Sequence, residues 1–297
     1  MFKSVLKKDN YGYLFIAPYF IAYFTFGLYP VLYSLYLSFT KWDGVSAIKF
    51  IGLGNYVNLL NDDVFLKSIG NTWIIWIFNV IPQMLLAIFL AVLLTQYSIK
   101  GTSIFRAIFY VPNLVTAASI GVLFNILLDW QTGTVNKLLI SMGLLKDPIN
   151  WLNEPVYARA TVSLIQFWQW FGPTMIFFIA GIKAIPVELY EAAYVDGANR
   201  WRTFWTITLP LLRPVVLYQA ITSLIGGMQI FDVPMTLTDG MGSPEKSILT
   251  MVMYLYNTAF KNYNYGYGAA VAYALFLMIL VFSIIVFKII TRRSLYD

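Results

Sequence analysis

Histidine and cysteine are both absent from this sequence, and the polar side chains that recur inside its apolar stretches are amides, hydroxyls and indoles. Two sets of small or polar residues recur at helical spacing inside apolar stretches: Gln166, Gln169 and Trp170 at i, i+3 and i+4, and Thr222, Gly226 and Gln229 at i, i+4 and i+7. Residues at these spacings share one face of a helix. Amides supply donors and acceptors together, and an aromatic face covers apolar C–H groups. The two faces suit an uncharged, hydroxyl-rich ligand, with hydrogen bonding between packed helices as the alternative.

The missing residue types exclude several kinds of site. Without histidine or cysteine the chain lacks the commonest metal ligands and the commonest general base. No Gly-x-x-x-x-Gly-Lys-Ser/Thr phosphate loop occurs in the sequence, so ATP cannot be bound in that manner. We therefore expect no enzyme, no catalytic residue, no metal and no cofactor in this chain.

Composition predicts an all-α integral membrane protein. Hydrophobic residues make up 59% of the 297 positions and charged residues only 11%, whereas a soluble domain typically carries about 25% charged residues. A membrane-spanning helix needs about 20 mostly apolar residues. Six stretches meet this requirement, at about 12–39, 71–95, 104–128, 161–185, 214–232 and 268–290.

The basic residues predict which ends of these spans face the cytoplasm. Six spans put both termini and the segment 186–213 on one side, which holds twelve of the Lys and Arg residues, and the other side holds eight over longer loops. Lys and Arg are enriched in cytoplasmic loops. We therefore expect cytoplasmic termini and a cytoplasmic 186–213 segment. Topology also accounts for the net charge of +6, so no nucleic acid partner is expected.

The segment 186–213 is the one long polar, helix-like stretch between strongly apolar spans. We expect two short helices joined by a turn at Asp196-Gly197, because glycine tolerates positive φ. Trp201, Phe204 and Trp205 fall at i, i+3 and i+4 on the second helix. Such a group of aromatic residues suits docking onto a partner, and packing against the chain's own helices is the alternative.

The spacing of this segment resembles the coupling loop of ATP-binding-cassette (ABC) importer permeases. It reads Glu191-Ala192-Ala193, three residues, Gly197, nine residues, then Ile207-x-Leu209-Pro210. Nearly the whole chain is similar to the carbohydrate branch of that family, and to its maltose-permease first-subunit type in particular. The other matching pieces are Ala17-Pro18, Tyr29-Pro30, Ser34 to Trp42, Phe50 to Tyr56, Pro112, Leu237 to Gly240 and Tyr265 to Gly268.

The resemblance implies a type I ABC importer permease fold, forming one permease domain over 1–297 in a bacterial-type cell membrane. The chain would be half of a sugar or oligosaccharide translocation pathway that works by alternating access. It implies as partners a second, distinct permease, two ATPase subunits that bind ATP and Mg, and an extracytoplasmic solute-binding protein. The residues it assigns to ATPase coupling are Glu191, Ala192, Ala193, Gly197, Trp201, Phe204 and Trp205.

The resemblance also implies a substrate pathway on the helices either side of the coupling loop. Aligned outward from the loop, its positions are Gln166, Gln169, Trp170, Thr222, Ile225, Gly226 and Gln229. Asp232 is expected to be an interfacial carboxylate that reaches water, with a role in the substrate site as the alternative. Two other functions stay open: an ABC importer permease for another solute, such as a glycerol phosphate ester, and an ion-coupled secondary transporter. The first would want a basic residue in the cavity, and the second would want intramembrane carboxylates or broken helices in repeated halves.

Overall fold

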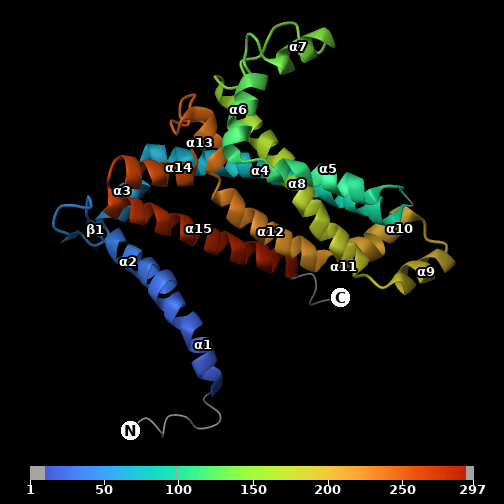
Figure 1. The fold of residues 1–297 in the computed structure, drawn as a ribbon, viewed down its shortest axis with the longest axis horizontal. Helices are drawn as coiled ribbons and strands as arrows, with labels where there is room; N and C mark the ends of the chain where they lie inside the picture. The colour runs from blue at the N-terminus through green and yellow to red at the C-terminus, as the bar shows by residue number, and fades with distance from the viewer. Residues whose placement is uncertain (1–10, 98, 292–297) are drawn as a thin grey trace. The chain divides into compact units, whose positions relative to one another are not determined.

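A computed structural model of the chain describes residues 11–97 and 99–291 (Figure 1). Within these residues the chain falls into two compact units: unit 1 comprises 11–62 and 255–274, and unit 2 comprises 63–254 and 275–291. Helices α14 (Met251–Tyr256) and α15 (Tyr265–Thr291) contribute residues to both. The ends of the chain, which we expect in the cytoplasm, lie outside the described residues.

Unit 1 is built on a long apolar helical run followed by a small hairpin. The run comprises α1 (Tyr11–Ala22), the π-helical η2 (Tyr23–Leu28) and α2 (Tyr29–Ser38). The strands β1 (Thr40–Lys41) and β2 (Lys49–Phe50) pair antiparallel, with Thr40 opposite Phe50. Helix α3 (Gly54–Leu60) and the π-helical η4 (Asn257–Lys261) follow. The buried Asn55 of α3 donates hydrogen bonds to the carbonyls of Ser38 (2.9 Å) and Thr40 (2.8 Å), which holds the hairpin to the end of α2.

Unit 2 is a helical bundle centred on two long helices that pack along each other (Figure 1). These are α4 (Asp63–Gln96) and α8 (Pro155–Lys183). Around them lie α5 (Thr102–Leu114), α6 (Ala117–Leu127), α12 (Arg213–Met228) and α13 (Asp232–Thr238), with α7 (Thr134–Ser141) in the connection between α6 and α8. The close contact of α5 with α8 depends on Gly172, because a Cβ there would clash with the backbone carbonyl of Phe109.

The described helices include five that are long and apolar enough to cross a membrane, and a sixth crossing if a bent pair is counted as one span. That pair is α5 and α6, which differ in direction by 92°. The expected span 104–128 is thus two helices rather than one. The chain is extended at Val115 and Thr116, and the Thr116 hydroxyl caps α6 by accepting a hydrogen bond from the Ser119 N–H. A threonine in this position favours the start of a new helix.

The other spans agree with the expected ones to within several residues. Helix α4 begins at Asp63 instead of 71, and α8 begins at Pro155 instead of 161, because the polar turns before each apolar stretch are also helical. The expected fifth span, 214–232, falls within the observed span Arg213–Thr238, which comprises α12, the break at residues 229–231 and α13.

Candidate functional site

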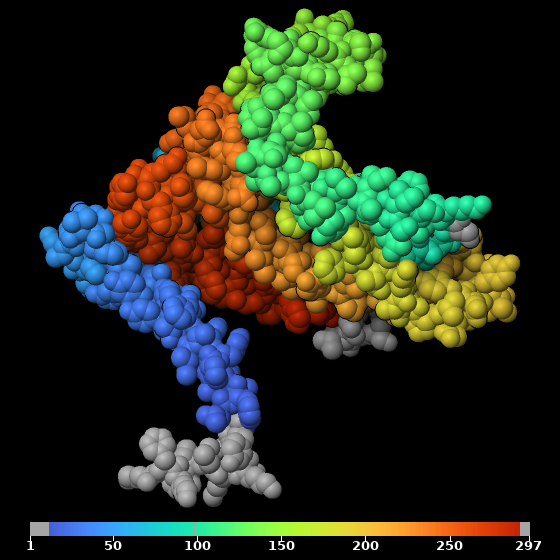
Figure 2. All heavy atoms as spheres, in the orientation of Figure 1, coloured from blue at the N-terminus to red at the C-terminus, as the bar shows by residue number. Residues whose placement is uncertain are grey.

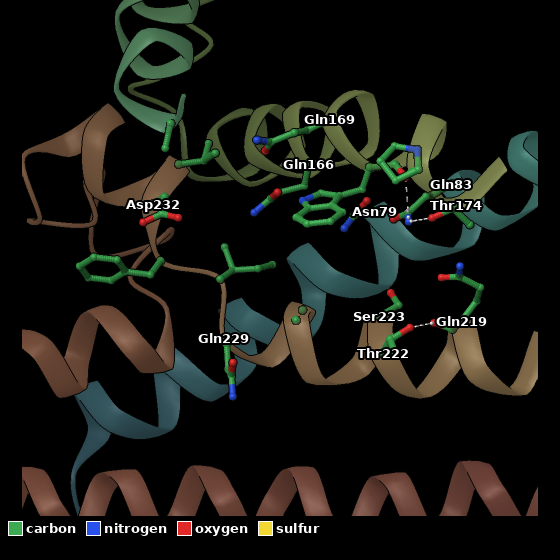
Figure 3. Close-up of a pocket in the computed structure, with 18 of the residues that line it drawn as sticks. Asn79, Gln83, Gln166, Gln169, Thr174, Gln219, Thr222, Ser223, Gln229 and Asp232 are labelled. Atoms are coloured by element: carbon green, nitrogen blue, oxygen red, sulfur yellow. Dashed lines mark hydrogen bonds between the residues drawn. The ribbon is translucent and has the colours of Figure 1, made fainter. Parts of the chain in front are cut away.

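Unit 2 encloses a cavity of about 440 Å³. Its walls come from α4, α8, α12 and α13, with Ala117 at the start of α6 (Figure 3). Six of the seven residues expected on the substrate pathway line it: Gln166, Gln169, Trp170, Thr222, Gly226 and Gln229. The side chain of Gln229 points away from those of Gln166 and Asn79. Ile225 is not among the lining residues. It lies at the edge of the face of α12 that lines the cavity, about 60° around the helix axis from Thr222.

Sequence reasoning missed several further polar residues of the wall, on α4 and on the two predicted helices α8 and α12. Helix α4 supplies Asn79 and Gln83, helix α12 supplies Gln219 and Ser223, and α8 adds Thr174. The first two pairs are each spaced i, i+4, which is the pattern that identified the predicted faces. Applying the same test to every apolar span would have found them.

Hydrogen bonds fix part of the cavity wall. The Gln83 side-chain amide donates to the Thr174 hydroxyl at 2.7 Å and to the Trp170 carbonyl at 3.4 Å, which joins α4 to α8 (Figure 3). On the other side the indole N–H of Trp76 donates to the Ser223 hydroxyl at 3.2 Å, which joins α4 to α12. These bonds hold the three long helices in register around the cavity.

Two buried polar atoms of the wall have no hydrogen-bond partner among the residues that the structure describes. They are Oδ1 of Asn79 and Nε2 of Gln219, on residues that are only 5% and 7% exposed. A buried polar group without a partner costs roughly 1–3 kcal/mol. One is an acceptor and the other a donor, and a hydroxyl group can serve both because it donates one hydrogen bond and accepts others. The wall therefore offers hydrogen bonds of the kind that a hydroxyl-rich ligand would complete.

The electrostatic character of the cavity is simple. Asp232 at the start of α13 is the one charged residue among those that line it, and its side chain is exposed. Among the described residues, no Lys or Arg stands in the wall. The Asp232 carboxylate therefore borders the cavity from an exposed position (Figure 3). Nothing in this wall would neutralise an anionic ligand.

The segment 186–213 forms the expected helix-turn-helix. Helix α9 (Val187–Val195) ends at Asp196, and Gly197 adopts a φ of +74°. The N–H of Ala198 donates to the Ala193 carbonyl (2.9 Å) and that of Gly197 to the Tyr194 carbonyl (3.0 Å). This pair of bonds is the Schellman motif, which requires the left-handed conformation at the glycine. The prediction of a turn at Asp196-Gly197 is confirmed.

The second half of the segment is helical but irregular. It comprises α10 (Arg200–Thr203), the π-helical η3 (Phe204–Thr208) and α11 (Leu209–Leu211), and the Asn199 side chain caps its start by accepting from the Arg202 N–H at 2.8 Å. The buried Thr208 hydroxyl accepts from the Gln96 amide (3.2 Å) and bonds the Tyr190 hydroxyl (3.1 Å). One side chain therefore ties both halves of the segment to the end of α4.

Trp201, Phe204 and Trp205 of this segment cluster with one another. Ring centroids of Phe204 and Trp205 lie 5.2 Å apart, and those of Trp201 and Trp205 lie 5.7 Å apart. Trp201 is nevertheless 71% exposed and Trp205 is 51% exposed. Tyr194 and Val195, next to the turn, are each 83% exposed. In the space-filling view the yellow α9 region stands at the edge of unit 2 (Figure 2). An apolar surface of this kind marks a site of protein or membrane contact.

Comparison with known proteins identifies the family. Residues 68–294 match the model of the binding-protein-dependent transport system inner membrane component. The lactose transport system permease protein of Rhizobium radiobacter is 36% identical over 261 residues, covering 87% of each chain. The arabinooligosaccharides transport system permease protein of Bacillus subtilis is 34% identical, covering 95% of this chain and 89% of that protein.

A solved structure shows the same fold. It is the bacterial alginate ABC transporter in complex with an alginate pentasaccharide-bound periplasmic protein. One of its chains superposes with a TM-score of 0.82 at 23% identity, covering 98% of this chain and 97% of that one. The resemblance drawn from the sequence is confirmed. This chain has the type I permease fold, and it belongs to the multi-pass membrane family of binding-protein-dependent transport system inner membrane components.

Proposed function

We propose that this chain is the permease subunit of an ATP-driven ABC importer for neutral sugars or oligosaccharides, and that its role is transport and not catalysis. The observation that carries the proposal is the amide-lined cavity of unit 2, with an unpartnered acceptor on Asn79, an unpartnered donor on Gln219 and no basic side chain. The names of the lactose and arabinooligosaccharide relatives agree with such a cargo.

The residues we assign to the substrate pathway are those that line this cavity. From the predicted set these are Gln166, Gln169, Trp170, Thr222, Gly226 and Gln229; Ile225 has the weakest support because it does not line the wall. To them we add Asn79, Gln83 and Gln219. The indole of Trp170 would cover the apolar face of a sugar ring while the amides bind its hydroxyls. A glycerol phosphate ester is disfavoured because the wall has no cation to bind the phosphate.

The complete importer is expected to contain four kinds of component. We propose that this chain, with both units acting as one permease domain, pairs with a second permease and binds one of two ATPase subunits that hold ATP and Mg. A solute-binding protein delivers the cargo, as the periplasmic protein in the alginate transporter complex suggests. Both termini and the coupling segment lie in the cytoplasm of a bacterial-type cell.

The coupling role is proposed for Glu191, Ala192, Ala193, Gly197, Trp201, Phe204 and Trp205. The exposure of Trp201 and Trp205 and the fixed turn at Gly197 support it. Closure of the ATPase pair would bind one state of the bundle better than the other and so shift the population toward the outward-facing state.

Uptake by the complete importer in proteoliposomes tests the cargo. The assay would offer a panel of neutral oligosaccharides, a uronate oligosaccharide and glycerol 3-phosphate, each with and without ATP. We expect ATP-dependent accumulation of a neutral oligosaccharide, lost in Asn79→Leu and Gln219→Leu and kept in Asn153→Leu, an exposed amide outside the cavity. Accumulation of glycerol 3-phosphate, or accumulation driven by an ion gradient without ATP, would overturn the proposal.

Copurification of the ATPase subunit tests the coupling role. Glu191→Lys and Trp201→Ala should each lower the amount of ATPase retained on the tagged permease. The control is Trp130→Ala, which removes an exposed indole from the connection between α6 and α8. Equal retention by all three variants would show that the 186–213 segment does not hold the ATPase.

A further inference from the structure

A second cavity of about 390 Å³ lies in unit 2 where the ends of α4 and α8 meet the coupling segment. Neither the sugar pathway nor the exposed aromatic cluster uses it. Residues from three parts of the chain line it, among them Gln96, Ile182, Lys183, Tyr190, Tyr194 and Arg200. The cavity therefore sits between two membrane-spanning helices and the segment that we propose binds the ATPase.

The charge of this cavity is the reverse of that in the first. Lys183 and Arg200 line it, and no carboxylate from the described part of the chain does. Neither cation forms an ion pair or a hydrogen bond with the described residues. The guanidinium of Arg200 lies over the ring of Tyr97, 4.3 Å from its centroid, which fixes its position while leaving its N–H donors free. Lys183 stands in the last turn of α8, where a cation offsets the helix dipole. The helix dipole accounts for the position of Lys183, but it does not account for the presence of both Lys183 and Arg200 in the wall of one cavity.

The remaining lining is suited to an amphiphilic ligand. Ile182, Ile185 and Val187 supply an apolar wall, and Thr95, Thr203 and Tyr190 supply hydroxyl groups. The position is also informative: α4 and α8 are 34 and 29 residues long, and each has the length and hydropathy of a membrane span. Their ends therefore lie near the level of the lipid headgroups, where anionic phosphates are abundant.

We propose that this cavity binds a phosphate group, with Arg200 and Lys183 as its cationic contacts. Arg binds phosphate through several N–H groups in a planar arrangement, and Lys adds a second positive charge. A bound phosphate joins the turn of the coupling segment to the ends of α4 and α8. The same phosphate group occurs in two kinds of ligand, the headgroup of an anionic phospholipid and soluble phosphate.

Titration of the purified full chain in detergent, followed by native mass spectrometry, tests the proposal. The probes are dioctanoyl phosphatidylglycerol, inorganic phosphate, and dioctanoylglycerol, which has the acyl chains without the phosphate. Arg200→Gln and Lys183→Gln should each weaken phosphatidylglycerol binding about fivefold, as expected for one cation near an anionic lipid. Arg200→Lys keeps the charge and should lose less. Lys288→Gln, which removes an exposed cation near the end of α15, should bind as the wild type does.

The probes separate the two sources. Binding of phosphatidylglycerol that inorganic phosphate does not displace identifies the lipid headgroup, and displacement by millimolar phosphate identifies a soluble ligand. Equal binding of dioctanoylglycerol and phosphatidylglycerol by the wild-type chain would overturn the proposal, as would unchanged affinity in both glutamine variants. The dioctanoylglycerol comparison needs no variant, so it stands even where a variant fails to fold. No sugar or ATPase is present, so failure here leaves the proposed cargo untouched.

Discussion

Two adjacent glycines on α12 should respond oppositely to the same substitution. A Cβ on Gly227 would lie 2.5 Å from Nε1 and 2.6 Å from Cγ of Trp76 on α4. A Cβ on Gly226 would meet no atom within 4 Å, although Gly226 lines the cavity. We therefore expect Gly227→Ala to destabilise the fold, and Gly226→Ala to leave it stable while placing a methyl group on the cavity wall.

The magnitude of the first effect follows from three contributions. Overpacking against a buried neighbour costs about 1–3 kcal/mol. Displacing Trp76 also breaks its 3.2 Å bond to Ser223, which is worth about 1 kcal/mol. Alanine is favoured over glycine in a helix by about 1 kcal/mol, which offsets the lost bond. The net change for Gly227→Ala is a loss of about 1–3 kcal/mol in the free energy of unfolding, whereas Gly226→Ala gains up to about 1 kcal/mol.

Thermal denaturation of the purified chain, followed by size-exclusion chromatography, measures the stability difference. Uptake by the complete importer measures function: Gly226→Ala should change sugar uptake without lowering the midpoint. Adding Trp76→Leu to Gly227→Ala should recover part of the lost stability, because the smaller side chain relieves the clash. A Gly227→Ala variant as stable as the wild type, with no change on adding Trp76→Leu, would refute the described approach of α4 and α12.

Three further predictions concern other parts of the structure. Thr208→Val removes the buried hydroxyl that bonds Gln96 and Tyr190, and thermal denaturation should show a loss of about 1–2 kcal/mol of stability. The control is Thr206→Val, which removes an exposed hydroxyl that donates to the Arg202 carbonyl and should cost almost no stability. Gly197→Val should cost about 1–2 kcal/mol of stability because φ at this residue is +74°, and Gly197→Asn should cost less because asparagine tolerates that conformation. A lower denaturation midpoint for the asparagine variant than for the valine variant would contradict the left-handed conformation at Gly197. The Ser46 hydroxyl and N–H donate to the Asp43 carboxylate and lower the pKa of Asp43 to about 2, so the stabilising effect of the ionised carboxylate is complete above pH 4 and is lost as the pH falls through about 2. In Ser46→Ala, carboxyl NMR should show the pKa of Asp43 rising toward 3.8. An unchanged pKa would show that the hydroxyl plays no part.

Local signals explain what could be predicted from the sequence. The turn at Gly197 depends on one residue that tolerates positive φ, and the spans depend on runs of apolar residues, so both are readable without tertiary information. The break at Val115 and Thr116 is different. Pro112 lies before it, but Pro82 and Pro173 stand inside α4 and α8, which continue unbroken. Packing of α6 against α13, with the Gly121 backbone close to Thr236, accompanies the bend and is invisible in a local pattern.

The cavity was predicted only in part because its wall joins residues far apart in the chain. Gln166 and Thr222 come from spans next to the recognisable coupling segment, and the alignment outward from that segment reaches them. Asn79 and Gln83 belong to α4, which no recognised motif adjoins. Their i, i+4 spacing indicates that they share one face of α4. Which face of α4 contacts α8 is determined by tertiary packing, such as the Gln83–Thr174 hydrogen bond.

Comparison with other buried amides of unit 2 bears on whether these polar faces serve packing alone. Asn71 is fully used: its amide donates to the carbonyls of Lys246 (2.7 Å) and Leu249 (3.1 Å), and its oxygen accepts from Arg159 at 3.2 Å. Asn79, about two turns along the same helix, keeps an unpartnered oxygen at the cavity. Interhelical hydrogen bonding would favour satisfied amides at both positions, since an unpaired buried atom is destabilising. The difference supports a wall in which Gln83 and Ser223 hold the helices while Asn79 and Gln219 are left for the transported solute.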